Sequence, residues 1–241
     1  MITLFRKEIN EFLNSLVAYI AIGIFLLGVG LIMWILPNSN VLDYGYATLD
    51  PVFSLGPYVY LFLIPAITMR SFAEEKRSGT MELLYTMPLR SWEVISAKYL
   101  AALFLVAFSL LPTLLYYYTV YYLGNPAGNL DTSGIIGSYI GLFLLGGVFT
   151  SIGLLTSSIT ENQIISFILA AFLCFFLYEG FQAIATIDVL SSISYYLEQL
   201  GIAFHYASMS KGVLDLRDLV YFLGLIFLFL LSTRLIIETK K

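Results

Sequence analysis

The sequence predicts an all-α integral membrane protein with six transmembrane helices. Of the 241 residues, 59% are hydrophobic and only 12% are charged, whereas soluble domains carry roughly 25% charged residues. The apolar residues form long runs, and the charged residues collect between them. The single cysteine, Cys174, lies inside one of these runs and excludes an internal disulfide.

Six apolar runs have the length that a membrane span requires. A helix needs roughly 20 apolar residues to cross a hydrocarbon core of about 30 Å. We expect the spans at residues 15–36, 52–69, 95–123, 134–157, 164–184 and 219–235. No small-residue cleavage site follows the first run, which therefore does not resemble a signal sequence.

Residues 1–14 precede the first span and have an amphipathic pattern. One face carries charged and amide side chains, and the other carries apolar residues at helical spacing: Phe5, Ile9, Phe12, Leu13 and Leu16. This pattern predicts a helix that lies along the membrane interface. A frayed continuation of the first span is the alternative.

Lysine and arginine set the expected orientation. An even number of spans places both termini on one side of the membrane. If that side is the cytoplasm, only Lys211 and Arg217 of the 12 basic residues lie outside. This asymmetry favours cytoplasmic termini.

Residues 71–90, between the second and third spans, form the most charged part of the chain. We expect Gly79 to end a helical extension of the second span. Thr80 then begins a short helix that ends at Pro88, and Ser91 caps the third span. The short helix carries five large apolar residues: Met81, Leu83, Leu84, Tyr85 and Met87. They either rest on lipid and on the chain's own helices or dock on a cytoplasmic partner.

Residues 43–90 closely resemble permease subunits of the ABC-2 class of ABC transporters. The pattern R-S-F-A-E-E-K-x-x-G-T-x-E-x-L at residues 70–84 recurs in that class between the second and third helices. The segments 122–131, 157–175 and 205–222 extend the similarity, most closely to permeases associated with gliding motility.

This resemblance implies a multi-pass subunit of a bacterial inner membrane that works as a dimer on two ATPase subunits. The partners would be a GldA-like ATPase and either a GldG-like membrane subunit or a second copy of the chain. The segment 71–90 would be a coupling helix inserted into a cleft of the ATPase. The implied contact residues, with Met81 and Leu84 added from the apolar positions, are Glu74, Glu75, Lys76, Arg77, Gly79, Thr80, Met81, Glu82, Leu83 and Leu84.

Several classes of function lack their sequence signatures. The chain has no G-x-x-x-x-G-K-[ST] loop, so we expect a non-enzymatic subunit without a cofactor, whose partner binds ATP. The centres of the spans carry no Asp, Glu, Lys, Arg or His, which argues against an ion-driven transporter. We expect no metal site, a structural role for the lone His205, and no binding of nucleic acid, because basic residues are sparse.

Three features leave alternatives open. The pair Gly137-x-x-x-Gly141 permits close helix packing, either inside the chain or against a second subunit. Glu179 either reaches water at the outer end of the fifth span or lines an outer vestibule. Residues 186–218 form either short re-entrant outer helices, as in ABC-2 permeases, or a helix on the outer leaflet, with Gly201 as a helix stop.

We therefore expect an ABC-2 permease that couples ATP hydrolysis in a partner to work across the membrane. Another ABC-2 exporter, such as one that serves copper-enzyme maturation, is the alternative within transport. In a different class, the chain would transmit force to an outer partner while no solute crosses. The transported substrate is not readable from the sequence.

Overall fold

A computed structural model describes residues 1–36, 40–43, 47–82, 90–187 and 193–239. These parts of the chain are helices joined by turns and contain no strand, which confirms the all-α class. The helices run in the order α1 Ile2–Leu13, α2 Leu16–Trp34, α3 Asp50–Thr68, α4 Ala73–Arg77, α6 Ser91–Leu110, α7 Leu114–Leu123, α8 Thr132–Ile159, α9 Gln163–Phe175, α10 Phe181–Ala185, α11 Ser194–Leu200, α12 Ile202–Met209 and α13 Leu216–Thr239.

Two short irregular segments join consecutive helices. The 3-10 turn Leu111–Thr113 contains Pro112 and joins α6 to α7, because proline cannot donate an interior helical hydrogen bond. The π-helical segment Phe176–Gly180 joins α9 to α10. Each joined pair forms one continuous helical segment that is long and apolar enough to cross a membrane.

Within the described residues, five helical segments are long and apolar enough to cross a membrane. They are Asp50–Arg77, Ser91–Leu123, Thr132–Ile159, Gln163–Ala185 and Leu216–Thr239. Helices α1 and α2 are bent by 65° relative to each other. Taken together as one span they pass the same test, which brings the number of candidate spans to as many as six. This count confirms the membrane class.

Helix α8 occupies the centre of the bundle and contacts α3, α6, α9, α12 and α13. Small residues allow this packing. A Cβ atom added to Gly137 would lie 2.5 Å from the carbonyl oxygen of Gly212, and one added to Gly141 would lie 2.6 Å from Cβ of Met209. At these two glycines the close neighbour is therefore α12 and the turn that follows it, within the same chain.

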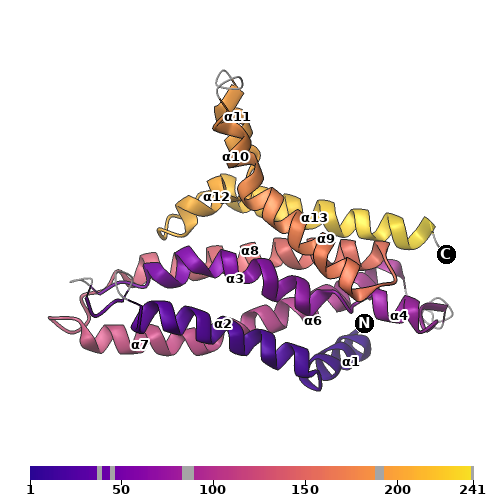
Figure 1. The fold of residues 1–241 in the computed structure, drawn as a ribbon, viewed down its shortest axis with the longest axis horizontal. Coiled ribbons are helices and arrows are strands. Elements are labelled where there is room, and N and C mark those ends of the chain that lie inside the picture. Colours follow the sequence, from indigo (N-terminus) through magenta and orange to yellow (C-terminus); the bar gives the residue numbers. More distant parts are fainter. Residues whose placement is uncertain (37–39, 44–46, 83–89, 188–192, 240–241) are drawn as a thin grey trace.

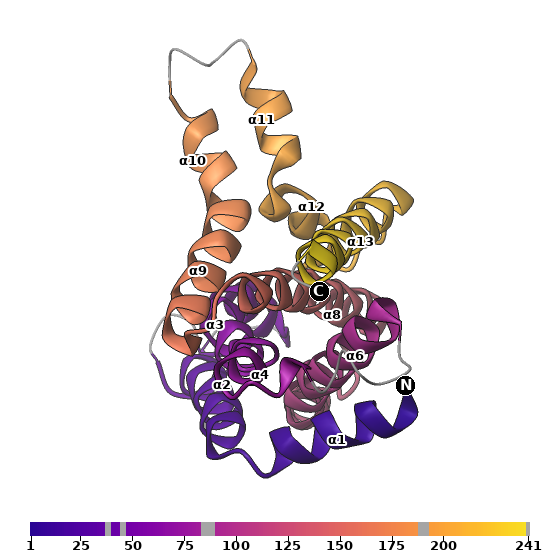
Figure 2. The same ribbon diagram turned by 90° about the vertical axis from the view of Figure 1, so that its right-hand side faces the viewer.

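Helix α9 packs against α3 and α8, α10 and α11 form an arm that leaves the bundle, and α13 runs alongside the bundle on the same side (Figures 1 and 2). Only 22% of the apolar window in Gln163–Ala185 and 17% of that in Leu216–Thr239 are buried within the chain. Gly201 follows the last residue of α11, as predicted. Glu179 accepts a hydrogen bond of 2.8 Å from the Tyr58 hydroxyl of α3.

The two chain termini and α4 lie at the same end of the molecule (Figure 1). We call this the α4 end. The charged residues of α1 and of the segment after α3 meet there, and the candidate functional site is built from them.

Candidate functional site

Helix α4 is a short helix of five residues that continues α3 after the turn at residues 69–72, within the single segment Asp50–Arg77. The backbone N–H and the hydroxyl of Ser78 both donate to the Glu74 carbonyl, at 2.9 Å and 2.8 Å, and so close the end of the helix. Gly79 has φ +71°, a left-handed conformation that favours glycine, and so ends the helix as predicted. The chain is helical again at Met81 and Glu82.

The turn between α3 and α4 is hydrogen-bonded to the end of α8 through one side chain. The Ser157 hydroxyl oxygen accepts hydrogen bonds from the backbone N–H groups of Phe72 (2.9 Å) and Ala73 (3.0 Å). The same hydroxyl group donates to the Met69 carbonyl (3.1 Å). Lys76 donates to the backbone carbonyl of Ser158. These hydrogen bonds join α4 and the turn before it directly to the central helix.

A buried charge cluster ties α4 to two further helices. The Lys98 ammonium of α6 lies 2.7 Å from Glu8 Oε1 of α1 and 2.8 Å from Glu75 Oε1 of α4. Lys98 is only 1% exposed, and its ammonium also lies over the Phe72 ring at 5.2 Å from the centroid. Charged groups this deeply buried persist only when they are paired. The cluster therefore fixes α1, α4 and α6 relative to one another.

The residues predicted to contact an ATPase divide into an exposed and a buried group. Glu75 and Met81 are buried in the chain's own packing, Met81 beside Leu4 and Phe72, and Lys76 is half-buried. Leu83 and Leu84 lie outside the described residues. The exposed residues of the set are Glu74, Arg77, Gly79, Thr80 and Glu82.

The sequence reasoning missed Glu8 and Lys98 as members of this site. In α1 the buried positions are Leu4, Glu8 and Phe12, each one helical turn after the last. The sequence signal that could have identified Glu8 is a carboxylate in the middle of an apolar stripe, because such a group requires a buried partner. The buried face of α1 therefore differs from the predicted apolar face, and Leu13, which belongs to the predicted face, is exposed.

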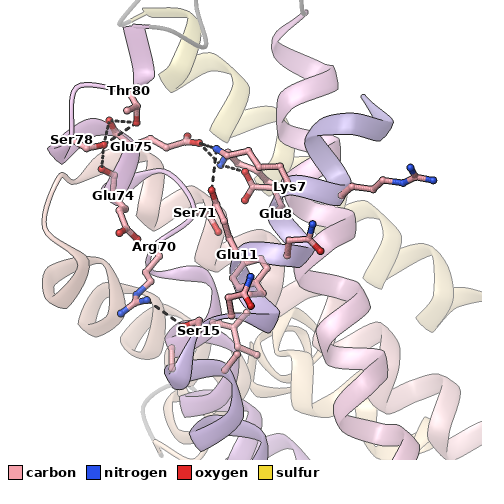
Figure 3. A pocket seen from close by; sticks show the side chains of 18 of the residues that line it. Lys7, Glu8, Glu11, Ser15, Arg70, Ser71, Glu74, Glu75, Ser78 and Thr80 are labelled. Atoms are coloured by element: carbon pink, nitrogen blue, oxygen red, sulfur yellow. Dashed lines mark hydrogen bonds and ion pairs between the residues drawn. The ribbon is translucent and has the colours of Figure 1, made fainter.

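A cavity of about 920 Å³ opens between α1, the end of α3 and α4 (Figure 3). Its polar wall includes Lys7, Glu11, Arg70 and Glu74, and Lys98 reaches it from α6. Lys7 forms an ion pair of 3.2 Å with Glu11. No group of three or more His, Cys, Asp or Glu side chains suited to a metal occurs in the described parts of the chain.

The fold and this polar end define a class of protein: a helical membrane domain in which the short helix α4, directly after α3, is hydrogen-bonded to α8 and ion-paired with α6. Comparison with family models identifies the class, since the model described as ABC-2 family transporter protein matches residues 47–231. The match covers most of the sequence, and the chain belongs to this family. A search among curated proteins gives no match.

Proposed function

We propose that the chain is the permease subunit on which a separate ATPase docks, through residues 71–90, to drive work across a membrane. The observation that carries this proposal is the attachment of α4 to the bundle. Ser157 joins it to α8, and Lys98 joins it to α1 and α6. A force applied at this turn reaches the bundle without passing through a flexible linker.

The exposed residues Glu74, Arg77, Thr80 and Glu82 offer charged and polar groups to a partner in water. Such groups at the rim of an interface set register and encounter rate more than affinity. Leu83 and Leu84 would supply the apolar anchors, which usually carry most of the binding energy. Glu75 and Met81 would hold the segment from within, because both are buried.

The finer identity that we propose is GldF, the permease of the gliding-motility transporter. It rests on the similarity of residues 122–131, 157–175 and 205–222 to that protein. The ATPase would then be GldA-like. The complex would lie in a bacterial inner membrane, with both termini and the α4 end in the cytoplasm. The excess of Lys and Arg at this end of the chain supports that orientation.

A second membrane subunit, GldG-like or a copy of this chain, would cover α9 and α13. These two membrane-crossing helices are the least buried within the chain. Large apolar side chains are exposed on both, such as Phe172 and Phe227. Lipid alone would also cover them, so the choice is decided by whether a second permease is present in the purified complex.

The arm of α10 and α11 favours force transmission as a second candidate function. It extends sideways from the bundle, across the bundle's long axis (Figures 1 and 2), where it would offer a surface to a partner protein. In that case ATP hydrolysis would move the arm and no solute would cross.

The test of the proposed function is purification of the tagged chain from its native membrane in mild detergent. We expect a soluble ATPase and a second permease to co-purify, and we expect ATP hydrolysis only in the complex. The isolated chain should hydrolyse no ATP because it has no phosphate-binding loop. Robust hydrolysis by the pure chain, or a complex without an ATPase, would contradict the proposal.

A further inference from the structure

Side chains from α12 and α13 hold the last residues of α11, at the base of the arm. The Nε2 atom of His205, on α12, lies 2.9 Å from the carbonyl oxygen of Gln199. The Tyr221 hydroxyl of α13 donates to the Leu200 carbonyl at 2.6 Å. The rings of His205 and Tyr221 stack, with 3.9 Å between their centroids. The end of a helix leaves carbonyl groups without helical partners, so these two side chains complete the end of α11.

The other ring nitrogen of His205 meets a carboxylate from α13. Its Nδ1 atom lies 2.7 Å from Oδ1 of Asp218, and the Ser208 hydroxyl donates to Oδ2 of the same carboxylate at 2.5 Å. The side chains of His205 and Asp218 are only 14% and 11% exposed. The imidazole ring therefore bridges the end of α11 and the start of α13, away from most of the solvent.

Both ring nitrogens of His205 face hydrogen-bond acceptors. The Gln199 carbonyl can only accept, so Nε2 must carry a proton, and a neutral imidazole has a single N–H group. Without a second proton, the lone pair of Nδ1 would face a carboxylate oxygen of Asp218 at 2.7 Å and repel it. This arrangement therefore holds one proton more than a neutral imidazole and a carboxylate carry together. Imidazole ordinarily binds a proton at higher pH than a carboxylate does, so the extra proton belongs on Nδ1.

We propose that His205 and Asp218 form a protonation-dependent latch that holds the base of the arm to α13. When the pair loses its extra proton to solvent, one N–H group is left for two acceptors. It stays with Asp218, because hydrogen bonds to a charged acceptor are the stronger ones. The Gln199 carbonyl then lacks its donor, and the attachment of α11 to α13 depends on the bond from Tyr221. Raising the pH therefore loosens the arm.

The neighbouring titratable groups do not replace either member of the latch. Four charged residues on α11, on α13 and in the turn between α12 and α13 form no ion pair with the latch in the described parts of the chain: Glu198, Lys211, Asp215 and Arg217. Glu179, on the π-helical segment, accepts from Tyr58, and Tyr206 of α12 donates to the Phe53 carbonyl. Helix α8, which also packs against α12, carries no Asp, Glu, Lys, Arg or His. Asp218 is therefore the charged partner of the imidazole.

The latch lies toward the end of the molecule opposite to α4. Asp218 is in the first turn of α13, and the last turns of that helix reach the α4 end (Figure 1). With the orientation proposed above, the latch would respond to the pH outside the cytoplasm. This last statement rests on the proposed function, whereas the latch itself does not.

His205 is the single histidine of the chain, so selective ¹⁵N labelling of histidine reports its protonation directly. NMR spectra of the full chain in detergent are recorded from about pH 5 to about pH 9, a range that brackets the ordinary titration of imidazole. We expect both ring nitrogens to carry protons at the acidic end and one proton to be lost as the pH rises. An imidazole that is neutral at the acidic end, or that keeps both protons throughout, would overturn the proposal.

Pulsed EPR between two spin labels measures the arm over the same pH range. The labels are placed in a Cys174→Ala background at Tyr196→Cys on α11 and Leu235→Cys on α13, which are 69% and 58% exposed. We expect one narrow distance while the imidazole is doubly protonated, and loss of that narrow distance as the proton leaves. A distance that stays unchanged while His205 titrates would refute the latch.

Two variants and one matched control assign the effect to the pair. In Asp218→Asn the amide N–H donates to Nδ1 of a neutral imidazole, so the narrow distance should persist and its pH transition should be lost. His205→Gln removes the imidazole and should also abolish the transition. Glu198→Gln removes a carboxylate of α11 that is outside the latch and should behave like the wild type. If either folded variant of the pair kept the wild-type pH transition, the assignment would be wrong.

Discussion

At the scale of single residues, Lys98 is the feature that organises the α4 end. One ammonium group that is 1% exposed neutralises carboxylates from two other helices, at 2.7 Å and 2.8 Å. Removing one member of a buried ion cluster leaves an uncompensated charge, and the cost is larger than the contribution of the pair itself. The cluster therefore makes the relative position of α1, α4 and α6 sensitive to single substitutions.

The first prediction follows from this cluster. Lys98→Met should lower the free energy of unfolding by about 3–5 kcal/mol, because Glu8 and Glu75 are left buried without a cation. Denaturant unfolding in detergent measures the change. The control is Arg234→Met, which removes a half-exposed pair with Glu238 and should change stability by less than about 1 kcal/mol. Equal small effects of both substitutions would contradict the structural role of Lys98.

At the scale of elements, the backbone of α8 packs closely against the backbone of the turn that follows α12. Gly137→Ala should destabilise the chain by about 1–3 kcal/mol, because its new Cβ would lie 2.5 Å from the Gly212 carbonyl oxygen. Gly224→Ala is the matched control in α13, where nothing lies within 4 Å of the added atom. Thermal unfolding of the two variants in detergent compares them. If Gly137→Ala were as stable as Gly224→Ala, the contact of α8 with the turn at Gly212 would be refuted.

Local sequence signals predicted the ends of helices well, but they did not predict which side chains contact one another. Gly79 and Gly201 were correct as helix stops, since glycine is favoured where a helix ends. Ser91 was wrong as the cap of the third span: the cap is Arg90, whose N–H donates to the Glu93 carboxylate at 2.9 Å. The strong local preference of serine for caps misled the prediction by one residue.

The candidate site was predictable only in part. The charged segment 71–90 stands out in the sequence because its neighbours are apolar. The pairing of Lys98 with Glu8 and Glu75 depends on three helices far apart in the chain meeting at one point. A periodic pattern within one helix does not contain that information, although Glu8 within the stripe of Leu4 and Phe12 indicates that a partner exists.

At the scale of the whole molecule, both termini and α4 share one end (Figure 1). We predict that this end faces the cytoplasm. In a Cys174→Ala background, an impermeant thiol reagent added outside the cell should label Asn129→Cys and leave Ser78→Cys unlabelled. Both positions are exposed in the folded chain, so exposure alone does not separate them. The opposite labelling pattern would reverse the orientation.

The most direct test of the central claim, that residues 71–90 are the ATPase-docking element, is co-purification of the ATPase with Leu83→Asp. Leu83 lies outside the described residues, and its role rests on the apolar pattern of the segment. A carboxylate at a buried anchor would be desolvated in the interface, so we predict loss of the ATPase. Leu214→Asp, an exposed position between α12 and α13, is the control and should retain it. If Leu83→Asp reached the membrane normally and retained as much ATPase as the wild type, the docking element would lie elsewhere.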